Sequence, residues 1–215
     1  VSRNVGLGFS VIADEIGPVK EQNVFADFSY TIKVSENANL ALGLKGGFSF
    51  LNANLSLLDL GDNLPDDLFT DNNLDRTVAN FGAGAFYYTD RFYIGLSMPN
   101  MLKTLHFEKE GGVVSRAIED MHYFITSGVV FNASDNLKLK PSVMLKAVNG
   151  APVSIDLSGN ALINDTFELG LSWRTDDSIS GMFNILVAPS TRIGYAYDYT
   201  LSNLGDFNSG SHEVF

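Results

Sequence analysis

The sequence predicts an all-β chain, an antiparallel up-and-down transmembrane β-barrel of the outer-membrane type, with roughly 12 strands visible of about 14. Apolar and polar residues alternate through most of the chain, and no apolar run reaches the roughly 18 residues of a membrane-spanning helix. The clearest alternation lies in 193–201, where one face carries Ile193, Tyr195, Tyr197, Tyr199 and Leu201. Tyrosines suit a membrane–water boundary, because the ring is apolar and the hydroxyl stays hydrated.

Composition and charge narrow the classes of protein. The chain has 215 residues, 45% of them hydrophobic, and we expect a single domain over residues 1–215. Lys and Arg number 14 against 25 Asp and Glu, and the net charge of −11 argues against nucleic acid and anionic lipid headgroups as partners. The sequence has no cysteine, which excludes disulfides, a thiolate nucleophile and cysteine metal sites.

Each alternating stretch predicts one strand. In order, the stretches cover 5–13, 24–34, 40–50, 79–87, 92–98, 123–131, 137–145, 153–157, 167–173, 183–187 and 193–201. Short polar turns separate most of them, and Thr175–Ser180 is expected to be a polar loop. A short helix is expected at Ser115–Glu119.

The lengths of the connections alternate along the chain. Asn52–Arg76, Asn100–Asp120 and the connection after about residue 201 are long, whereas the turns after about residues 34, 88, 132, 163 and 188 are short. Long and short connections therefore fall at opposite ends of the strands, as in bacterial outer-membrane barrels, whose long loops are extracellular. The turns near Asn149 and Thr175 depart from this pattern, being short although they lie at the long-loop end.

The same alternation assigns side chains to two environments. The residues expected to face lipid include Phe28, Leu42, Phe92, Val143 and Tyr197. The residues expected to face the lumen include Ser29, Lys45, Lys140 and Asp198. An error of one residue in register would exchange the two sets.

Six short motifs, in this order, carry a family resemblance: Asn4–Gly8, Asp14–Pro18, Tyr93–Pro99, Lys140–Ser142, Ile193–Asp198 and Gly210–Glu213. With them the chain resembles the PorP/SprF family of type IX secretion system outer-membrane proteins. The signature positions are Gly194, Tyr195, Tyr197, Asp198, Ser211, His212 and Glu213. Family members are longer at both ends, so we expect the barrel to be incomplete at both ends.

The resemblance implies a location in the cell outer membrane and a function without enzymatic activity or cofactor. Some family members act in export and others retain surface adhesins used in gliding. The resemblance therefore implies binding and anchoring of a secreted adhesin, or of other cargo, through its C-terminal domain, together with contacts to other secretion components and to membrane lipid. The candidate partner-binding residues lie in the two long connections. They are Asp59, Asp62, Asp66, Asp67, Asp71, Lys103, Glu108 and Lys109.

Charged residues recur at positions expected to face the lumen. They are Lys138, Lys140, Lys146, Asp156, Glu168, Arg174 and Asp198. The lysines alone could select anions in a pore, but acidic residues on neighbouring strands favour an internal ion network.

The sequence does not predict a metal or catalytic site. The three histidines, His106, His122 and His212, lack metal-ligand spacing, and His212-Glu213 is read as an inward-facing polar pair at a strand start. Asp71, Asn73 and Asp75 resemble half of a calcium loop. Arg76 then stands where the loop needs glycine and no glutamate closes it, which favours a solvated acidic loop.

Two other classes of function remain open at this point. A diffusion porin would have the same strands and would differ in conductance. A soluble β-sandwich adhesin would instead bury its apolar faces in a shared core.

Overall fold

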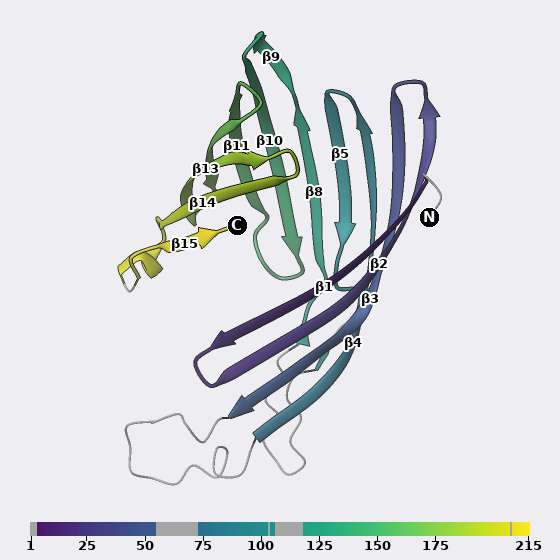
Figure 1. Cartoon of the computed structure of the whole chain (residues 1–215). Helices are drawn as coiled ribbons and strands as arrows, with labels where there is room; N and C mark the ends of the chain where they lie inside the picture. Colours follow the sequence, from purple (N-terminus) through teal and green to yellow (C-terminus); the bar gives the residue numbers. More distant parts are fainter. Residues whose placement is uncertain (1–3, 55–72, 103, 106–117, 207) are drawn as a thin grey trace. The chain divides into compact units, whose positions relative to one another are not determined.

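A computed structural model describes residues 4–54, 73–102, 104–105, 118–206 and 208–215 (Figure 1). It contains a 13-stranded antiparallel sheet, which confirms the predicted all-β, up-and-down class. The first strands are β1 (Val5–Ile16), β2 (Val19–Ser35), β3 (Ala38–Asn54), β4 (Asn73–Thr89), β5 (Phe92–Met98), β8 (His122–Val129) and β9 (Phe131–Ser134). The others are β10 (Leu137–Val148), β11 (Ser154–Ile163), β12 (Phe167–Arg174), β13 (Ser178–Ala188), β14 (Thr191–Thr200) and β15 (Ser211–Val214).

Strands that follow one another in sequence pair side by side. The order runs from β1 at one edge to β15 at the other, with β9 added to β10, so the sheet is open at its two edge strands. A separate two-stranded sheet pairs β6 (Thr104–Leu105) with β7 (Ile118–Glu119). The described residues also form the 3₁₀ helix η2 (Asn203–Asp206), and none of their helices is long and apolar enough to cross a membrane.

Several boundaries differ from the sequence-based expectation, and three of them fall on an expected connection, loop or helix. β3 continues to Asn54 and β4 begins at Asn73, so strand residues occupy both ends of the expected connection 52–76. This is possible because a backbone ladder needs no apolar side chains, and here the Asn52 Nδ2 donates to Asp75 Oδ1 across the two strands at 2.5 Å. β13 begins at Ser178, inside the expected loop 175–180. Ile118 and Glu119 form strand β7 and pair with Leu105 and Thr104 of β6, so the helix expected over 115–119 is wrong at these two residues. Residues 115–117 lie outside the described residues.

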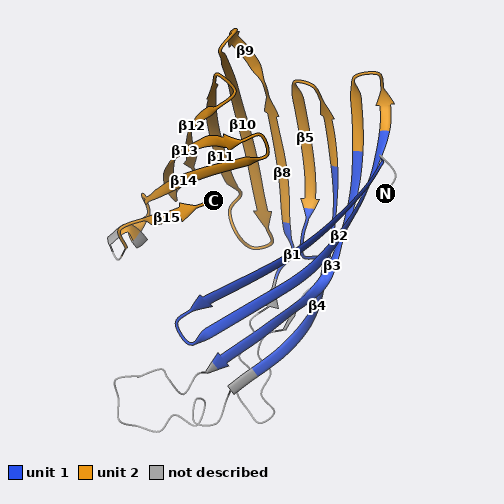
Figure 2. Cartoon of the chain, viewed as in Figure 1, with its two compact units in different colours: residues 1–32, 41–85, 98–122 blue, residues 33–40, 86–97, 123–215 orange. Residues whose placement is uncertain are grey.

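The chain forms two compact units (Figure 2). Unit 1 comprises Val1–Ile32, Ala41–Ala85 and Met98–His122, and unit 2 comprises Lys33–Leu40, Phe86–Ser97 and Tyr123–Phe215. The single domain expected over residues 1–215 stays a prediction.

Unit 1 contains an aromatic residue at a position where alternation places polar ones. Phe25 has the parity of Asn23 and Asp27, yet its side chain is buried at 7% exposure. The ammonium of Lys45 lies 4.7 Å from the centre of the Phe25 ring, a cation–π contact. Gly47 leaves room for the ring, because a Cβ there would lie 2.6 Å from Phe25 Cδ1. The polar side of these strands therefore holds a small packed centre.

In unit 2 the register aligns residues of one kind in rows across the strands. One row joins Ser142, Ser158, Ser172, Ser180 and Asp198. The adjacent row joins Val143, Leu157, Trp173, Ile179 and Tyr199. We call the side of the first row the polar face and that of the second the apolar face. Lys140 and Asp198 thus share the polar face, and Val143 and Tyr197 the apolar face, as alternation predicts.

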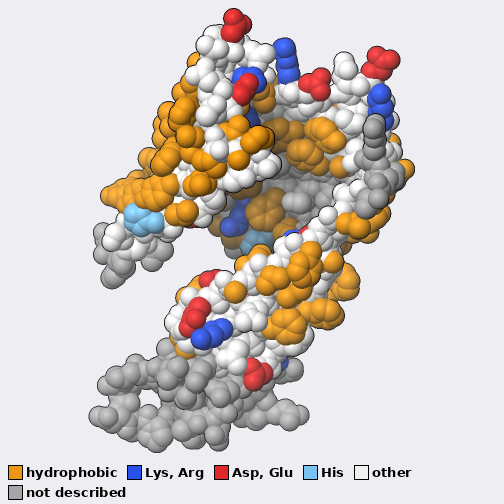
Figure 3. Space-filling view, viewed as in Figure 1, with side chains coloured by type: hydrophobic (Ala, Val, Ile, Leu, Met, Phe, Trp, Pro, Cys, Tyr) orange, Lys and Arg blue, Asp and Glu red, His pale blue; other side chains and the backbone are white. Residues whose placement is uncertain are grey.

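The large apolar side chains are left uncovered. On the apolar face, Leu171 is 71% exposed and Ile193 52%, and Phe28 and Leu42 of unit 1 are 46% and 45% exposed. Hydrophobic side chains gather over the strands in Figure 3. Among the described residues only Phe25, Ala38 and Ala53 are buried hydrophobics. A soluble sandwich would bury such faces, so this pattern argues against that alternative.

Candidate functional site

All seven charged residues predicted to face the lumen lie on the polar face of unit 2. They belong to β10, β11, β12 and β14. We call the row of Ser142, Ser158, Ser172, Ser180 and Asp198 the serine row. The ion pairs of the charged residues form two groups, one on either side of this row, rather than the one continuous network that the sequence favours. Lys146 and Asp198 join neither group by an ion pair in the described part of the chain.

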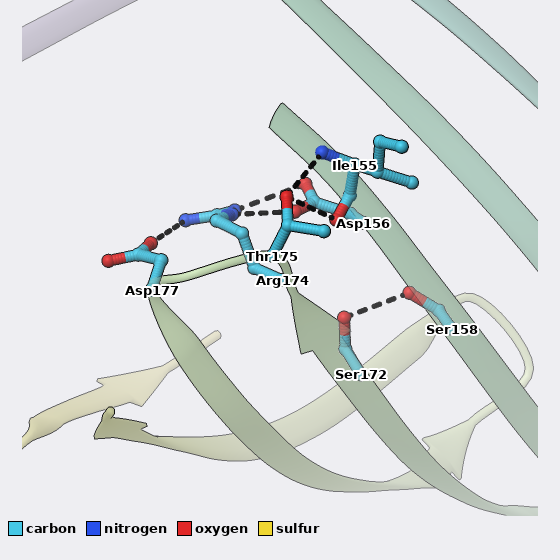
Figure 4. Close-up of polar contacts among 7 residues, drawn as sticks. All are labelled: Ile155, Asp156, Ser158, Ser172, Arg174, Thr175 and Asp177. Atoms are coloured by element: carbon cyan, nitrogen blue, oxygen red, sulfur yellow. Dashed lines mark hydrogen bonds and ion pairs between the residues drawn. The ribbon is translucent and has the colours of Figure 1, made fainter. Parts of the chain in front are cut away.

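The first group is a clasp built on Arg174, the last residue of β12 (Figure 4). Its Nε donates to Asp156 Oδ1 at 2.6 Å and its Nη2 to Asp156 Oδ2 at 3.2 Å, a bidentate pair between β12 and β11. Its Nη1 donates to Asp177 in the following turn at 3.1 Å. The Asp156 carboxylate is only 10% exposed, so Arg174 supplies the charge that makes its burial tolerable.

Two hydrogen bonds that involve hydroxyl groups extend the clasp. Thr175 Oγ1 accepts the backbone N–H of Ile155 at 3.0 Å, which ties the turn after β12 to β11. Ser158 Oγ donates to Ser172 Oγ at 3.0 Å in the serine row. The clasp satisfies its own charges and ties β11, β12 and the turn after β12 together, which suits a structural role.

The second group surrounds Glu168 near the start of β12. Asn160 Nδ2 donates to Glu168 Oε1 at 2.8 Å, and Asn184 Nδ2 donates to Oε2 at 2.9 Å. Lys140 Nζ lies 3.8 Å from Oε1, at the outer limit of an ion pair. The two amides therefore hold the carboxylate, and Lys140 adds charge without a close contact.

Two further cations flank this carboxylate. Arg192 Nη1 donates to Asn184 Oδ1 at 2.7 Å, and Nη2 donates to the backbone oxygen of Asp165 at 3.3 Å. Lys138 Nζ pairs with Asp165 Oδ1 at 2.5 Å. A cavity of about 200 Å³ opens among Lys138, Lys140, Glu168 and Arg192. We call Lys138, Lys140, Glu168 and Arg192, together with Asn160 and Asn184, the cation cluster.

A tight turn positions one side of the cation cluster. Asn164 and Asp165 have φ values of +52° and +53°, and the N–H of Thr166 donates to the carbonyl of Ile163 at 3.0 Å. This is the pattern of a type I′ turn, which Asn and Asp tolerate better than other side-chain-bearing residues. The turn presents both the carboxylate and the carbonyl of Asp165 to the cations.

Sequence reasoning missed part of this cluster. The sequence places Asp165 only in the turn after about residue 163, and the expected strand begins at Ile193, whereas β14 begins two residues earlier, at Thr191, and includes Arg192. Counting back by two from Asp198 reaches Arg192 and places it on the polar face, so the signal was present. No sequence pattern predicts that the amides of Asn160 and Asn184 both donate to the Glu168 carboxylate.

The signature residues lie where β15 pairs with β14. Tyr197 pairs with His212 and Asp198 with Ser211, while Glu213 pairs with Ala196 on the polar face. Tyr195 Oη lies 2.6 Å from His212 Nδ1, and the rings of Tyr197 and His212 are 4.9 Å apart. His212 thus lies on the apolar face, so reading His212-Glu213 as an inward-facing pair was wrong for His212, since neighbours in a strand point to opposite faces.

Gly194, Tyr197 and Phe215 complete the β14–β15 contact. The N–H of Gly194 donates to the carbonyl of Phe215 at 2.7 Å, and the Phe215 ring occupies the space that a Cβ of Gly194 would take. Tyr197 Oη donates to the carbonyl of Ser209 at 2.5 Å. These contacts give the signature positions a structural role at the edge of the sheet.

The candidate partner-binding residues Asp59, Asp62, Asp66, Asp67, Asp71, Lys103, Glu108 and Lys109 lie outside the described residues. So does His106. Within the residues that the structure does describe, no group of three or more potential ligands could hold a metal ion.

A wide hollow borders the cation cluster at Lys140 and Asn160. Its volume is about 980 Å³, and most of its lining belongs to the apolar face of β10–β13, including Pro141, Gly159, Leu171 and Gly181. The two glycines leave open space there, since a Cβ on Gly159 would meet nothing within 4 Å. The hollow is therefore mainly an indentation of the apolar face.

An up-and-down sheet with exposed apolar side chains on one face and charged ones on the other defines a class, the membrane-spanning β-proteins of the outer membrane. Comparison with known families agrees. The family described as type IX secretion system membrane protein PorP/SprF matches residues 1–215, and the chain belongs to it. The resemblance seen in the sequence is therefore confirmed over the whole chain.

The other comparisons add little. No curated protein matches the chain. Among solved structures, a FadL homologue of Pseudomonas aeruginosa is similar with a TM-score of 0.48 and 13% identity, covering 93% of this chain and 68% of that one.

Proposed function

We propose that the chain is a non-enzymatic outer-membrane component of the type IX secretion system that binds and anchors the C-terminal domain of a secreted surface adhesin. The observation that carries the proposal is the family match over residues 1–215. The polar face is consistent with a scaffold, because the clasp of Arg174 engages its own charges in contacts between strands. Other components of the same system are further partners.

The placement of the long connections supports a binding surface at one end. They join β3 to β4 and β5 to β8, and the residues that flank both gaps belong to unit 1. In an antiparallel order these connections leave the strands at the same end. Long barrel loops are extracellular, so this end would meet a surface adhesin.

Loop deletion tests the proposal. Deleting 59–71 or 103–112 should release the adhesin into the medium while the barrel stays folded, since surface loops add little to strand packing. A matched control inserts an epitope at Asp90, in the turn between β4 and β5, where adhesin retention should not change. Adhesin on cells and in the medium is measured by immunoblotting.

Conductance separates the anchor from a diffusion porin. An anchor should show negligible conductance in a planar bilayer. If both loop deletions keep the adhesin on the cell and the purified protein conducts ions freely, the anchor proposal fails and the porin takes its place.

A further inference from the structure

The cation cluster has more donors than its internal contacts use. Its cavity of about 200 Å³ is lined by Lys138, Lys140 and Arg192, and the volume holds about six waters at ~30 Å³ each. That is enough for a carboxylate or phosphate group with accompanying water. The side chains of Lys138 and Lys140 are 40% and 42% exposed, so a ligand can reach both ammonium groups.

The acidic residues nearby leave these cations partly unengaged. The two amides already bond both oxygens of Glu168, and Lys140 approaches it only to 3.8 Å. Among the described residues, hydrogen bonds occupy two of the five N–H donors of Arg192, one to Asn184 and one to the carbonyl of Asp165. Because both oxygens of Glu168 already accept amide N–H groups, the remaining donors beside this cavity favour an external acceptor.

The charge count of the cluster is opposite to that of the whole chain. Three cations stand against the carboxylates of Glu168 and Asp165, which gives 3 − 2 = +1. The full sequence carries −11. A local positive site on an acidic protein attracts an anion where the rest of the surface repels it.

We propose that the cation cluster binds one oxoanion group, a carboxylate or a phosphate, at the short-turn end of β10–β14. Arg192 offers a planar fork that matches two oxygens of such a group, and the lysines add compact charges beside it. This goes beyond adhesin anchoring, because the site is built from strand and turn residues of unit 2 alone and needs no adhesin.

The test is calorimetric titration of the full chain in detergent with sodium phosphate and, separately, sodium acetate, against sodium chloride at constant ionic strength. We expect one oxoanion per chain. Lys140→Met and Arg192→Met should each weaken binding about tenfold or more, because each removes a charged hydrogen-bond donor. Asp165→Asn should tighten binding, because it frees Lys138 and keeps a residue that tolerates the turn.

Lys146→Met is the matched control. Lys146 lies on the same strand and face as Lys140 but outside the cavity, so its removal should change affinity less than about twofold. Tighter binding of phosphate supports a phosphorylated ligand, and equal or tighter binding of acetate supports a carboxylated one. Phosphate and acetate binding no better than chloride would overturn the proposal. So would an equal loss in Lys146→Met, which would indicate diffuse attraction. Because Asp165→Asn predicts a gain, misfolding cannot imitate the full pattern.

Discussion

Replacing Arg174 with methionine isolates the energetic role of the clasp. Methionine keeps most of the apolar stem and removes the guanidinium, which leaves the Asp156 carboxylate at 10% exposure without its bidentate partner. Breaking a fully buried ion pair costs about 3–5 kcal/mol. Because the Arg174 side chain is 44% exposed, water can partly replace it, and we expect a loss of about 2–3 kcal/mol.

The assay is reversible urea unfolding in phospholipid vesicles, followed by fluorescence. Trp173 is the only tryptophan in the chain and precedes Arg174, so its emission reports on this strand. Asp177→Asn is the internal control, because that partner is 46% exposed and exposed pairs contribute about 0–1 kcal/mol.

A double-mutant cycle decides whether the cost comes from the unpaired carboxylate. Adding Asp156→Asn to Arg174→Met removes that charge, so the double variant should be more stable than the sum of the single losses predicts, by about 1 kcal/mol or more. A loss below about 0.5 kcal/mol for Arg174→Met, or strict additivity in the cycle, would show that Asp156 does not depend on this partner.

Two further substitutions test the packing and the membrane-facing side. A Cβ on Gly128 would lie 2.6 Å from Tyr93 Oη, so Gly128→Ala should lower the free energy of unfolding by about 1–3 kcal/mol, and Tyr93→Leu in the same chain should recover part of it. Leu42→Arg should cost about 2–4 kcal/mol in lipid if the residue lies near mid-membrane, and an unchanged urea midpoint would contradict a lipid-facing Leu42.

Alternation predicted the faces of the strands well, because the period of two is a property of the extended backbone. Val143 and Tyr197 lie on the apolar face and Lys140 and Asp198 on the polar face, as expected. Phe25 is one exception, since its ring takes a polar-face position and contacts Lys45.

Pairing between strands was harder to predict, because it depends on register as well as on face. Lys146 and Asp198 were placed on the correct face, but their rows do not bring them into the ion pairs of Arg174 or Glu168. Strand ends were missed for a related reason. The ladder of β3 and β4 continues through polar residues such as Asn52 and Asp75, where the hydrophobic pattern had already faded.

The serine row also separates the two charged groups of the polar face. Glu168 and Arg174 are six residues apart on β12, about 20 Å at 3.3 Å per residue, and the polar-face residues between them on this strand are the uncharged Gly170 and Ser172. That separation exceeds the Debye length of about 8 Å at physiological salt. The clasp and the cation cluster should therefore behave as thermodynamically independent modules, so that stability changes made at Arg174 and affinity changes made at Lys140 add without coupling.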